Sequence, residues 1–398
     1  MPIDADQVMA NFLSRSFLQQ HVADTLGFYE PTALDPYGGF FHYFLDDGTV
    51  YNRRHRHLVS ATRFVFNGAM AKRHTGSAAV ADWARHGMAH LDAFKRSDGM
   101  YAWTVNDGHI EDATVMAYGQ AFVLLALAHA HSVGCASKAD VAAAFDRMND
   151  AFYSARDGAY ADEITPEGVL LAYRGQNANM HMCEACLTAF EFTGDVRYLD
   201  RAESLIEKFP FELAASADGL VWEHYRSDWS IDWDYNKDNP GNIFKPWGFQ
   251  TGHQTEWAKL LMIAHAHRPQ QRWVDRAAQL QLAAFEHGWD ARHGGLIYGF
   301  SPDLQPCDTD KYFWVQAESF ASAWRLWRHT GEQVFLRQYQ GLWQWSWQHM
   351  VDHEHGAWFR ILSADGSKLE NTKSPAGKVD YHTMGACWDV MQVGGLEP

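Results

Sequence analysis

Hydrophobic residues recur about every 3.6 positions along most of this chain, which is the period of a helix with one buried face. Shorter stretches rich in glycine, aspartate and aromatic residues separate these segments. The period predicts about twelve helices, over residues 5–27, 57–75, 78–95, 113–134, 138–154, 177–194, 197–208, 250–266, 271–287, 314–330, 332–351 and 380–392.

The stretches between the helical segments form a second repeat. Each contains an Asp-Gly, Gly-Gly or His-Gly turn followed by an aromatic-rich extended segment, as in Ser97-Asp98-Gly99-Met100-Tyr101. The turn glycines stand at positions 39, 99, 158, 219, 295 and 356. Glycine permits the positive φ that such turns need. Six turns at nearly regular intervals therefore indicate six structural repeats.

Two helices per turn, repeated six times, predict a closed ring of helical hairpins, an (α/α)6 barrel. One helix of each pair would line the centre and the other would face solvent. Length alone suggests two or three domains, but the repeat predicts a single catalytic domain over residues 1–398. An open superhelical stack is the structural alternative. Closure is favoured because the N-terminal helix would complete the last unit.

One interval between turn glycines, from 219 to 295, is longer than the others. The extra residues are expected within residues 222–250, a segment with several tryptophans and tyrosines. A long segment without regular structure is usually functional or disordered, and its aromatic content argues against disorder. We expect it to cover the mouth of the ring.

The composition limits which binding partners and which cellular compartment are expected. With 33 basic and 49 acidic residues the formal charge is −16, so neither a nucleic acid nor an anionic membrane is an expected partner. Five cysteines suit a reducing compartment with free thiols. The first residues lack the pattern of a secretory signal, and the apolar stretch 121–128 is too short to span a bilayer. A cytoplasmic location is expected.

Two segments place polar side chains on one face of a predicted helix. Asn177, His181 and Glu184 are spaced i, i+4, i+7. His253 and Glu256 are spaced i, i+3 near a helix start, where the carboxylate could hold one ring nitrogen and fix the tautomer. A hydrogen-bonded core histidine and a favourable acid at a helix start explain these patterns equally well.

Three further features carry candidate chemistry. Trp314 and Glu318 are spaced i, i+4, and a ring beside a carboxylate suits a polyol, although a buried tryptophan near a paired glutamate is the plainer interpretation. His382 lies at the start of the last predicted helix. Arg63 lies in an otherwise apolar helical run and needs a partner or a function.

A metal site is not expected from these patterns. Cys183 and Cys186 form a lone C-x-x-C with no second pair at zinc-ribbon spacing and no redox-protein context. The order His-x-x-Glu is the reverse of the Glu-x-x-His that di-iron bundles use. We therefore predict no metal and no other cofactor.

Taken together, these motifs resemble the N-acylglucosamine 2-epimerase superfamily over nearly the whole chain. They are His57-Leu58-Val59-Ser60-Ala61-Thr62-Arg63, Asn177-Ala178-Asn179-Met180-His181 with Glu184, Gly252-His253 with Glu256-Trp257, Trp314 with Gln316-Ala317-Glu318, and Asp380-Tyr381-His382 with Gly385-Ala386-Cys387. The resemblance implies an (α/α)6 barrel, in agreement with the repeat. It also implies a cofactor-independent sugar isomerase or 2-epimerase, nearest to the mannose-isomerising branch.

The resemblance also implies roles for particular residues. His382 and His253 are implied as the acid/base pair, and Arg63 as the group that holds the substrate oxygens at C1 and C2. The implied pocket residues are His181, Asn177, Tyr118, Glu256, Trp314 and Glu318. Val59 departs from the family pattern, because several relatives place a tryptophan there.

The implied reaction opens the sugar ring and then removes the proton on C2. Histidine supplies a base of suitable pKa, and Arg63 would stabilise the negative charge on O1 of a cis-enediolate. We assign the C2–C1 proton transfer to His382 and ring opening to His253, oriented by Glu256. The product is a ketose or a 2-epimer. A metal-dependent isomerase, a two-carboxylate glycoside hydrolase and a non-catalytic sugar-binding scaffold are the other classes. The substrate is a monosaccharide, and monomer and homodimer are both open.

Overall fold

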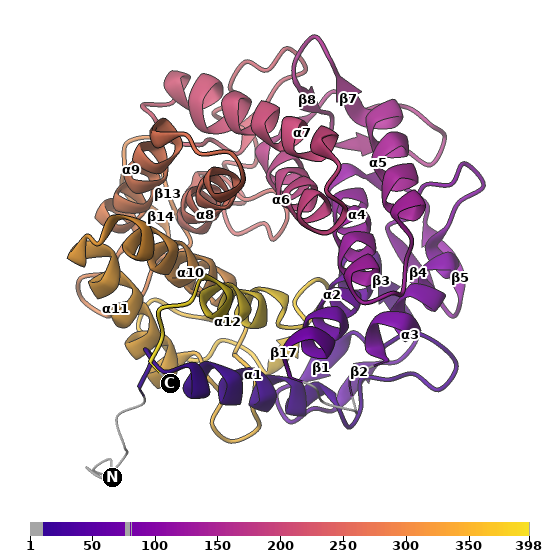
Figure 1. Cartoon of the computed structure of the whole chain (residues 1–398), viewed down its shortest axis with the longest axis horizontal. Helices are drawn as coiled ribbons and strands as arrows, with labels where there is room; N and C mark the ends of the chain where they lie inside the picture. Colours follow the sequence, from indigo (N-terminus) through magenta and orange to yellow (C-terminus); the bar gives the residue numbers. More distant parts are fainter. Residues whose placement is uncertain (1–10, 76–79, 81, 398) are drawn as a thin grey trace.

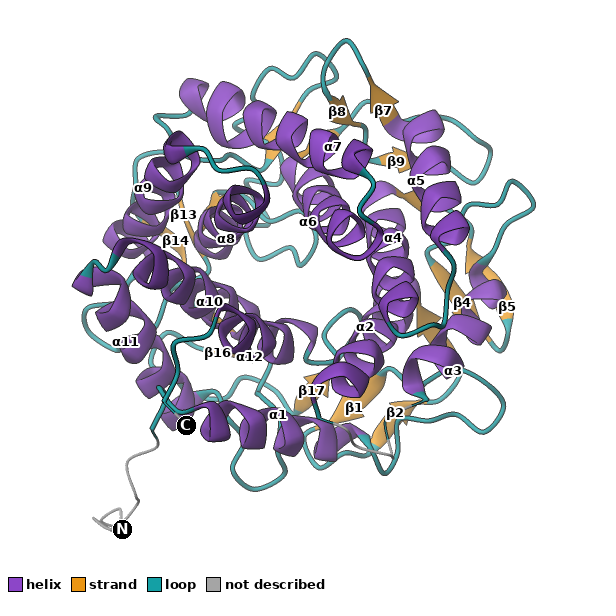
Figure 2. Cartoon of the chain, viewed as in Figure 1, coloured by secondary structure: helices purple, strands orange, loops and turns teal. Residues whose placement is uncertain are grey.

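Two concentric rings of helices form the molecule in the computed structural model, which describes residues 11–75, 80 and 82–397 (Figures 1 and 2). The inner ring consists of α2 (Leu58–His74), α4 (Ala117–Ser132), α6 (Gln176–Thr193), α8 (Thr251–His267), α10 (Phe313–Thr330) and α12 (Tyr381–Val393). The outer ring consists of α1 (Arg15–Tyr29), α3 (Trp83–His90), α5 (Lys138–Phe152), α7 (Val196–Ile206), α9 (Gln271–Gly288) and α11 (Gln333–His349). The predicted (α/α)6 barrel is confirmed.

Most helix boundaries lie within a few residues of the predicted ones. The first helix is shorter than predicted and begins at Arg15, while residues 5–10 of its predicted range lie outside the described residues. Positions 76–79 and 81, which include the predicted start of the third helix, are also outside them. The third helix ends in a 3-10 turn, η1 (Leu91–Phe94). Helix α7 continues into a π-helical turn, η2 (Glu207–Leu213), and a 3-10 turn, η3 (Ala214–Ser216). Pro210 lies within η2 and lacks the N–H that an α-helical hydrogen bond requires.

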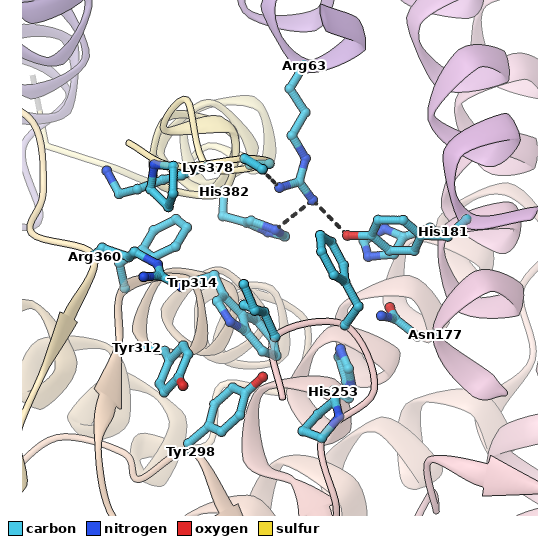
Figure 3. A pocket seen from close by; sticks show the side chains of 18 of the residues that line it. Arg63, Asn177, His181, His253, Tyr298, Tyr312, Trp314, Arg360, Lys378 and His382 are labelled. Atoms are coloured by element: carbon cyan, nitrogen blue, oxygen red, sulfur yellow. Dashed lines mark hydrogen bonds between the residues drawn. The ribbon is translucent and has the colours of Figure 1, made fainter. Parts of the chain in front are cut away.

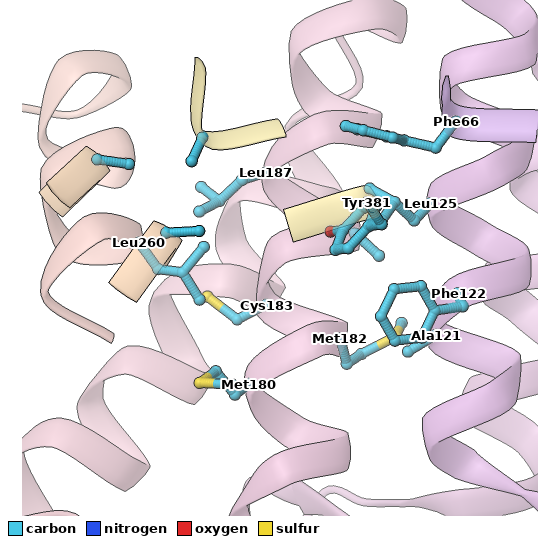
Figure 4. Packing of buried hydrophobic residues seen from close by; sticks show 14 of the residues in the cluster. Phe66, Ala121, Phe122, Leu125, Met180, Met182, Cys183, Leu187, Leu260 and Tyr381 are labelled. Carbon is cyan, nitrogen blue, oxygen red and sulfur yellow. The ribbon is translucent and has the colours of Figure 1, made fainter. Parts of the chain in front are cut away.

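Burial explains which helices form which ring. The outer helix α7 buries Tyr198, Leu199, Ala202, Leu205 and Ile206, a single stripe that faces the inner ring. The inner helix α4 buries side chains on all sides, from Ala117 to Ala130. Inner helices meet one another through compact apolar side chains, including Met180, Cys183, Leu187 and Leu260 (Figure 4).

The ring closes between the two ends of the chain. Helix α12 packs against α1, α2 and α10. Strand β17 (Thr372–Ser374) pairs antiparallel with β1 (Tyr43–Leu45), with Ser374 opposite Phe44. Near the two ends of the chain, Ser14 and Glu397 form a parallel bridge. These contacts between early and late segments establish a closed ring rather than an open stack.

Short antiparallel strands position the start of each inner helix. The remaining strands are β2 (Val50–Asn52), β3 (His55–His57), β4 (Thr104–Asn106), β5 (His109–Asp112), β6 (Val115–Met116), β7 (Tyr153–Ser154), β8 (Ala159–Tyr160), β9 (Glu163–Ile164), β10 (Arg174–Gly175), β11 (His224–Tyr225), β12 (Phe249–Gln250), β13 (Gly299–Phe300), β14 (Pro306–Asp308), β15 (Lys311–Tyr312) and β16 (Ile361–Leu362). The strand before each inner helix pairs with the strand after the next outer helix, as in β3–β4, β6–β9, β10–β11, β12–β13 and β15–β16. The inner helices therefore start side by side around one mouth of the barrel.

An amide side chain connects four of the predicted turns to the inner helices. Gln120 accepts a hydrogen bond from the Tyr101 N–H at 3.2 Å and donates to the Tyr101 carbonyl at 2.8 Å. Asn179, Gln254 and Gln316 make the same pair of bonds in their repeats. Each is the fourth residue of its helix. These hydrogen bonds thus attach the aromatic segment after each turn to the first turn of the inner helix that follows it in the chain.

Two further predictions concern membranes and cysteines. Within the described residues, no helix is both long enough and apolar enough to cross a bilayer. Cys183 and Cys186 are buried side chains of α6 and are not joined by a disulfide.

Candidate functional site

A cavity opens at the mouth where the inner helices begin (Figure 3). The space between its side chains, including the part open to solvent, is about 710 Å³. The lining residues are Arg63, Tyr118, Asn177, His181, Ile243, Phe244, Pro246, His253, Glu256, Tyr298, Tyr312, Phe313, Trp314, Arg360, Pro375, Ala376, Gly377, Lys378 and His382. Of the nine site residues expected from the sequence, eight line this cavity, and Glu318 does not.

Equivalent positions of the inner helices supply seven of these eight side chains. The second residue of an inner helix is Tyr118 in α4, Asn177 in α6, Trp314 in α10 and His382 in α12. The sixth residue, one turn further along, is Arg63 in α2, His181 in α6 and Glu256 in α8. Residues four apart share a helix face, so the repeat directs both positions toward the axis of the ring.

His382 is held by a carboxylate and faces Arg63. Its Nδ1 donates to Glu318 Oε1 at 2.6 Å, and its Nε2 lies 3.1 Å from Arg63 Nη2. Burial and the positive charge of Arg63 lower the pKa of His382 well below its ordinary value. The ring is therefore neutral, with its proton on Nδ1 and a lone pair on Nε2.

Glu318 supports His382 from behind and is not a cavity residue, contrary to the sequence-based expectation. Its second oxygen, Oε2, accepts a hydrogen bond from Lys259 Nζ, and both side chains are buried. Burial opposes the charge of Lys259, but Glu318 and Glu184 raise its pKa above the ordinary value. Glu318 lies one helical turn beyond Trp314, and its carboxylate is held between His382 and Lys259 rather than at the cavity.

His253 is oriented by Glu223, and the expectation that Glu256 orients it is wrong. His253 Nδ1 donates to Glu223 Oε1 at 2.8 Å. The other oxygen of Glu223 accepts from Gln176 Nε2 at 2.9 Å, and Gln176 in turn accepts from Trp257 Nε1 at 2.8 Å. Sequence reasoning missed Glu223 because it lies between a turn and strand β11, outside any helical periodicity.

His181 repeats the same arrangement. Its Nδ1 donates to Glu184 Oε2 at 2.9 Å, and Glu184 Oε1 accepts from the Tyr381 hydroxyl at 2.6 Å. Burial lowers the pKa of His181, and the bond to Glu184 partly offsets this effect. Burial would raise the pKa of Glu184, yet the bond from His181 and the charge of Lys259 hold it below the ordinary value. In all three cavity histidines Nδ1 thus donates to a carboxylate, and Nε2 is the nitrogen that does not bond to one.

Arg63 is fixed on several sides. Its guanidinium donates to the Gly377 carbonyl and, at 3.2 Å, to the Tyr118 hydroxyl. Its carbon Cζ lies 4.4 Å from the ring centre of Phe122 and 4.6 Å from that of Tyr381. These rings hold the guanidinium plane by cation–π contact. A fixed, permanently charged fork of donors therefore stands beside His382 Nε2.

Glu256 is the exception among the carboxylates of the site. Neither of its oxygens has a hydrogen-bond partner among the described residues, although the side chain is only 1% exposed. Its Oε1 lies 3.9 Å from His181 Nδ1, beyond hydrogen-bond distance. Burial, and after it the nearby charge of Glu318, raises the pKa of Glu256 well above its ordinary value.

The indole ring of Trp314 lies between His253 and His382. Its ring centre lies 4.9 Å from that of His253 and 5.9 Å from that of His382. It reaches this position because residue 252 is glycine: a Cβ atom there would overlap the indole ring. His253 and His382 therefore flank one aromatic surface inside one cavity.

The segment 222–250 contributes to the mouth of the cavity. Ile243, Phe244 and Pro246 line it. His224 Nε2 donates to the Pro246 carbonyl at 2.6 Å, and Lys245 pairs with Glu163 at 3.2 Å. Apart from β11 and β12 the segment consists of turns and irregular backbone.

Other rim residues were not identified from the sequence. Tyr298, Tyr312, Arg360 and Lys378 lie on short strands and loops, where no helical spacing marks them. Lys378 pairs with Asp380 at 2.5 Å, and burial lowers the pKa of Lys378 to about 8.

Histidines and glutamates gather closely enough beside the cavity to raise the question of a metal. Two groups in the described part of the chain bring nitrogen and oxygen atoms within 4.8 Å of one another. They are His181, Glu184 and Glu256, and Glu256, Glu318 and His382. Most of these atoms already bond to one another, and the cations Lys259 and Arg63 stand beside the carboxylates. Built-in cations thus supply the positive charge, and we assign no metal here.

Comparison with known proteins relates this site to sugar isomerases and epimerases. The family model of N-acylglucosamine 2-epimerase matches residues 39–386. A D-mannose isomerase of Marinomonas mediterranea is 48% identical over 386 residues, which are 96% of this chain and 98% of that protein. A D-mannose isomerase of Thermobifida fusca is 32% identical over 72% of each chain.

Solved structures agree in fold. A crystal structure of a D-mannose isomerase superposes with a TM-score of 0.94 at 47% identity and covers 96% of this chain and 99% of that one. A cellobiose 2-epimerase from Spirochaeta thermophila gives a TM-score of 0.83 at 23% identity, covering 95% and 96%, and shares the fold. With a family model that matches most of its length, this chain belongs to the N-acylglucosamine 2-epimerase family.

Proposed function

We propose that the protein is an aldose–ketose isomerase that interconverts D-mannose and D-fructose without a cofactor. The observation that carries the proposal is the convergence of His253, His382 and Arg63 on one cavity beside a tryptophan. The 48% identity to a D-mannose isomerase along nearly the whole chain supports the choice of sugar.

His382 is suited to move the proton between C2 and C1. Its Nδ1 proton is held by Glu318, so its Nε2 is the basic nitrogen. Nε2 takes the C2 proton of the opened aldose, and the electron pair of the C2–H bond moves through C1 to O1. Arg63 is 3.1 Å from this nitrogen and stabilises the charge on O1. The same imidazole then returns the proton to C1, and once the O2 proton has moved to O1 the product is a ketose.

His253 is suited to open the sugar ring. Ring opening moves a proton from the anomeric hydroxyl to the ring oxygen, and an imidazole with one accessible nitrogen can pass that proton on. Glu223 fixes Nδ1 of His253, so that task falls to Nε2. The two histidines thus act in sequence, and Trp314 between them offers a flat surface for the sugar.

Proton NMR of mannose in heavy water with the protein tests the proposal. Fructose formation with deuterium exchange at C2 is the expected result, whereas glucose without fructose would establish the alternative, a 2-epimerase. His382→Asn is expected to abolish both exchange and fructose formation. His253→Asn, as a matched control, should slow both while exchange stays measurable. Normal C2 exchange in His382→Asn would refute the assignment.

A cytoplasmic location is part of the same proposal. All five cysteines, Cys135, Cys183, Cys186, Cys307 and Cys387, are free thiols, which suits a reducing compartment. Cell fractionation of the source organism tests it, and recovery of the protein outside the cytoplasm would refute it.

A further inference from the structure

After ring opening, the conversion of the aldose to a ketose needs two proton transfers, and His382 accounts for only one. When an aldose becomes a ketose, the hydrogen on C2 moves to C1, and the hydrogen on O2 also moves to O1. The first transfer is between carbon atoms and is the task of His382. The second transfer requires a group that can give a proton to O1 and take one from O2.

We propose that Glu256, as a neutral carboxylic acid, carries the proton from O2 to O1 of the opened sugar. One oxygen of its carboxyl group donates a proton to O1, and the other accepts the proton of O2 as the C2=O bond forms. Glu256 loses one proton and gains one, so it is unchanged after each turnover. The inference deepens the proposed isomerase function and rests on it.

The hydrogen bonds of the site leave Glu256 available for this task. Glu184, Glu223 and Glu318 each accept bonds from a histidine and from a second donor. Glu256 lines the same cavity, and both of its oxygens lack a partner among the residues that the structure describes. A buried polar group without a partner is costly, so a substrate that bonds to both oxygens removes that cost.

The surroundings of Glu256 favour the protonated form. The charged and titratable groups around it come from all six inner helices. Its own helix α8 supplies His253 and Lys259, and the other five supply Arg63 (α2), Tyr118 (α4), His181 and Glu184 (α6), Glu318 (α10) and His382 (α12). Lys259 is already paired with Glu318. Burial and the nearby carboxylate of Glu318 raise the pKa of Glu256, which favours its protonated form.

No other cavity side chain suits this double transfer as well. Arg63 cannot be deprotonated. Burial raises the pKa of Tyr118 and makes it a poorer acid. An imidazole offers a single free nitrogen once Nδ1 is bound, so it cannot give and take a proton at the same moment. A carboxylic acid has a donor and an acceptor side by side, and His382 lies on the same side of the cavity, with a ring nitrogen within 4.8 Å of a Glu256 oxygen.

The test compares wild-type protein with Glu256→Gln in heavy water, with mannose as substrate. Fructose formation and deuterium exchange at C2 of mannose are measured together by NMR. Glutamine fills the same space but cannot take up a proton. Fructose formation should fall about 10²- to 10⁴-fold, while C2 exchange, which does not require the transfer from O2 to O1, falls less than about tenfold. The ratio of exchange to isomerisation therefore rises.

Two further variants separate catalysis from structure. Glu256→Asp keeps the acid and should keep the wild-type ratio even if it is slower. Glu184→Gln changes a neighbouring carboxyl whose oxygens are both occupied, so exchange and isomerisation should fall together. Fructose formation in wild type should decline on the alkaline side as Glu256 loses its proton, and that limb should be missing in Glu256→Gln. Thermal unfolding checks that each variant is folded.

The outcomes distinguish this inference from the function on which it rests. Wild-type protein that forms no fructose refutes the isomerase proposal and this inference together. Wild-type protein that forms fructose, with Glu256→Gln losing both activities in proportion or losing neither, refutes only the role of Glu256.

Discussion

Glu318→Gln is the change that most directly tests how the barrel prepares His382. The carboxylate accepts a bond from His382 Nδ1 at 2.6 Å on one oxygen and from Lys259 on the other. A glutamine has only one accepting oxygen. If that oxygen faces His382, the amide NH₂ meets the ammonium of Lys259. If it faces Lys259, the NH₂ meets Nδ1 and moves the imidazole proton to Nε2, the nitrogen that must act as base.

The expected magnitudes follow from that geometry. A hydrogen bond to a charged group is worth about 1.5–3 kcal/mol, and holding a catalytic histidine in the wrong tautomer costs up to about 10⁴-fold in rate. We expect kcat for mannose to fall about 10²- to 10⁴-fold. Breaking a buried ion pair costs about 3–5 kcal/mol, so Glu318→Gln should also lower the free energy of unfolding.

The double variant Glu318→Gln with Lys259→Met separates the two effects. Removing the unpaired ammonium should restore part of the stability, because no buried charge is then left alone. It should not restore kcat, because His382 still lacks its carboxylate. The assays are fructose formation from mannose and denaturant unfolding of the three proteins. A single variant that keeps kcat within about threefold while folding normally, or a double variant that regains kcat, would refute the reasoning.

Three other changes are expected to have separable effects. Glu223→Gln weakens the bond that orients His253, so kcat should fall about 10- to 100-fold with little change in unfolding, and an unaltered kcat would contradict this role. Gly252→Ala would push Trp314 aside, so it should raise KM for mannose more than it lowers kcat, as measured by steady-state kinetics. Burial lowers the pKa of His129 from 6.5 to about 3. The folded protein therefore holds His129 neutral, and the free energy of unfolding is not reduced by this residue above about pH 6.5. As the pH falls from there toward 3, the free energy of unfolding should drop by up to about 1.4 kcal/mol per pH unit. Unfolding measured between pH 7 and 4.5 should show that slope, and His129→Phe should reduce it.

The architecture was predictable because it repeats. The turn glycines and the helical period recur along the chain, so their spacing alone indicates six hairpins. The structure adds the physical reason for part of that spacing: Gln120, Asn179, Gln254 and Gln316 each bind the backbone of a turn from the fourth position of an inner helix. A local signal of this kind is carried within one repeat and can be seen in the sequence.

The orientation of the site residues was less predictable because it depends on contacts between repeats. Helical spacing placed His253 and Glu256 near each other, yet the carboxylate that holds His253 comes from residue 223, which has no periodic pattern around it. Glu318 was expected beside Trp314 in the cavity. Its role depends on His382 and on Lys259, which lie on two other helices. Spacing along one helix cannot identify partners on another.

The differences among the repeats are what carry the chemistry. Position six of the inner helices is Arg63, Phe122, His181, Glu256 and Glu318 in five successive repeats, so backbone positions that the fold makes equivalent hold a cation, an aromatic ring, an imidazole and two acids. Pseudo-symmetry brings these side chains to one axis without any long connecting loop. Their environments then separate two like groups: Glu318 accepts a hydrogen bond from Lys259, whereas Glu256 accepts none from any residue that the structure describes. Burial raises the pKa of both carboxyl groups, but the charge of Lys259 and its hydrogen bond oppose that rise at Glu318. Glu318 is thereby suited to hold His382, and Glu256 to donate to a sugar oxygen.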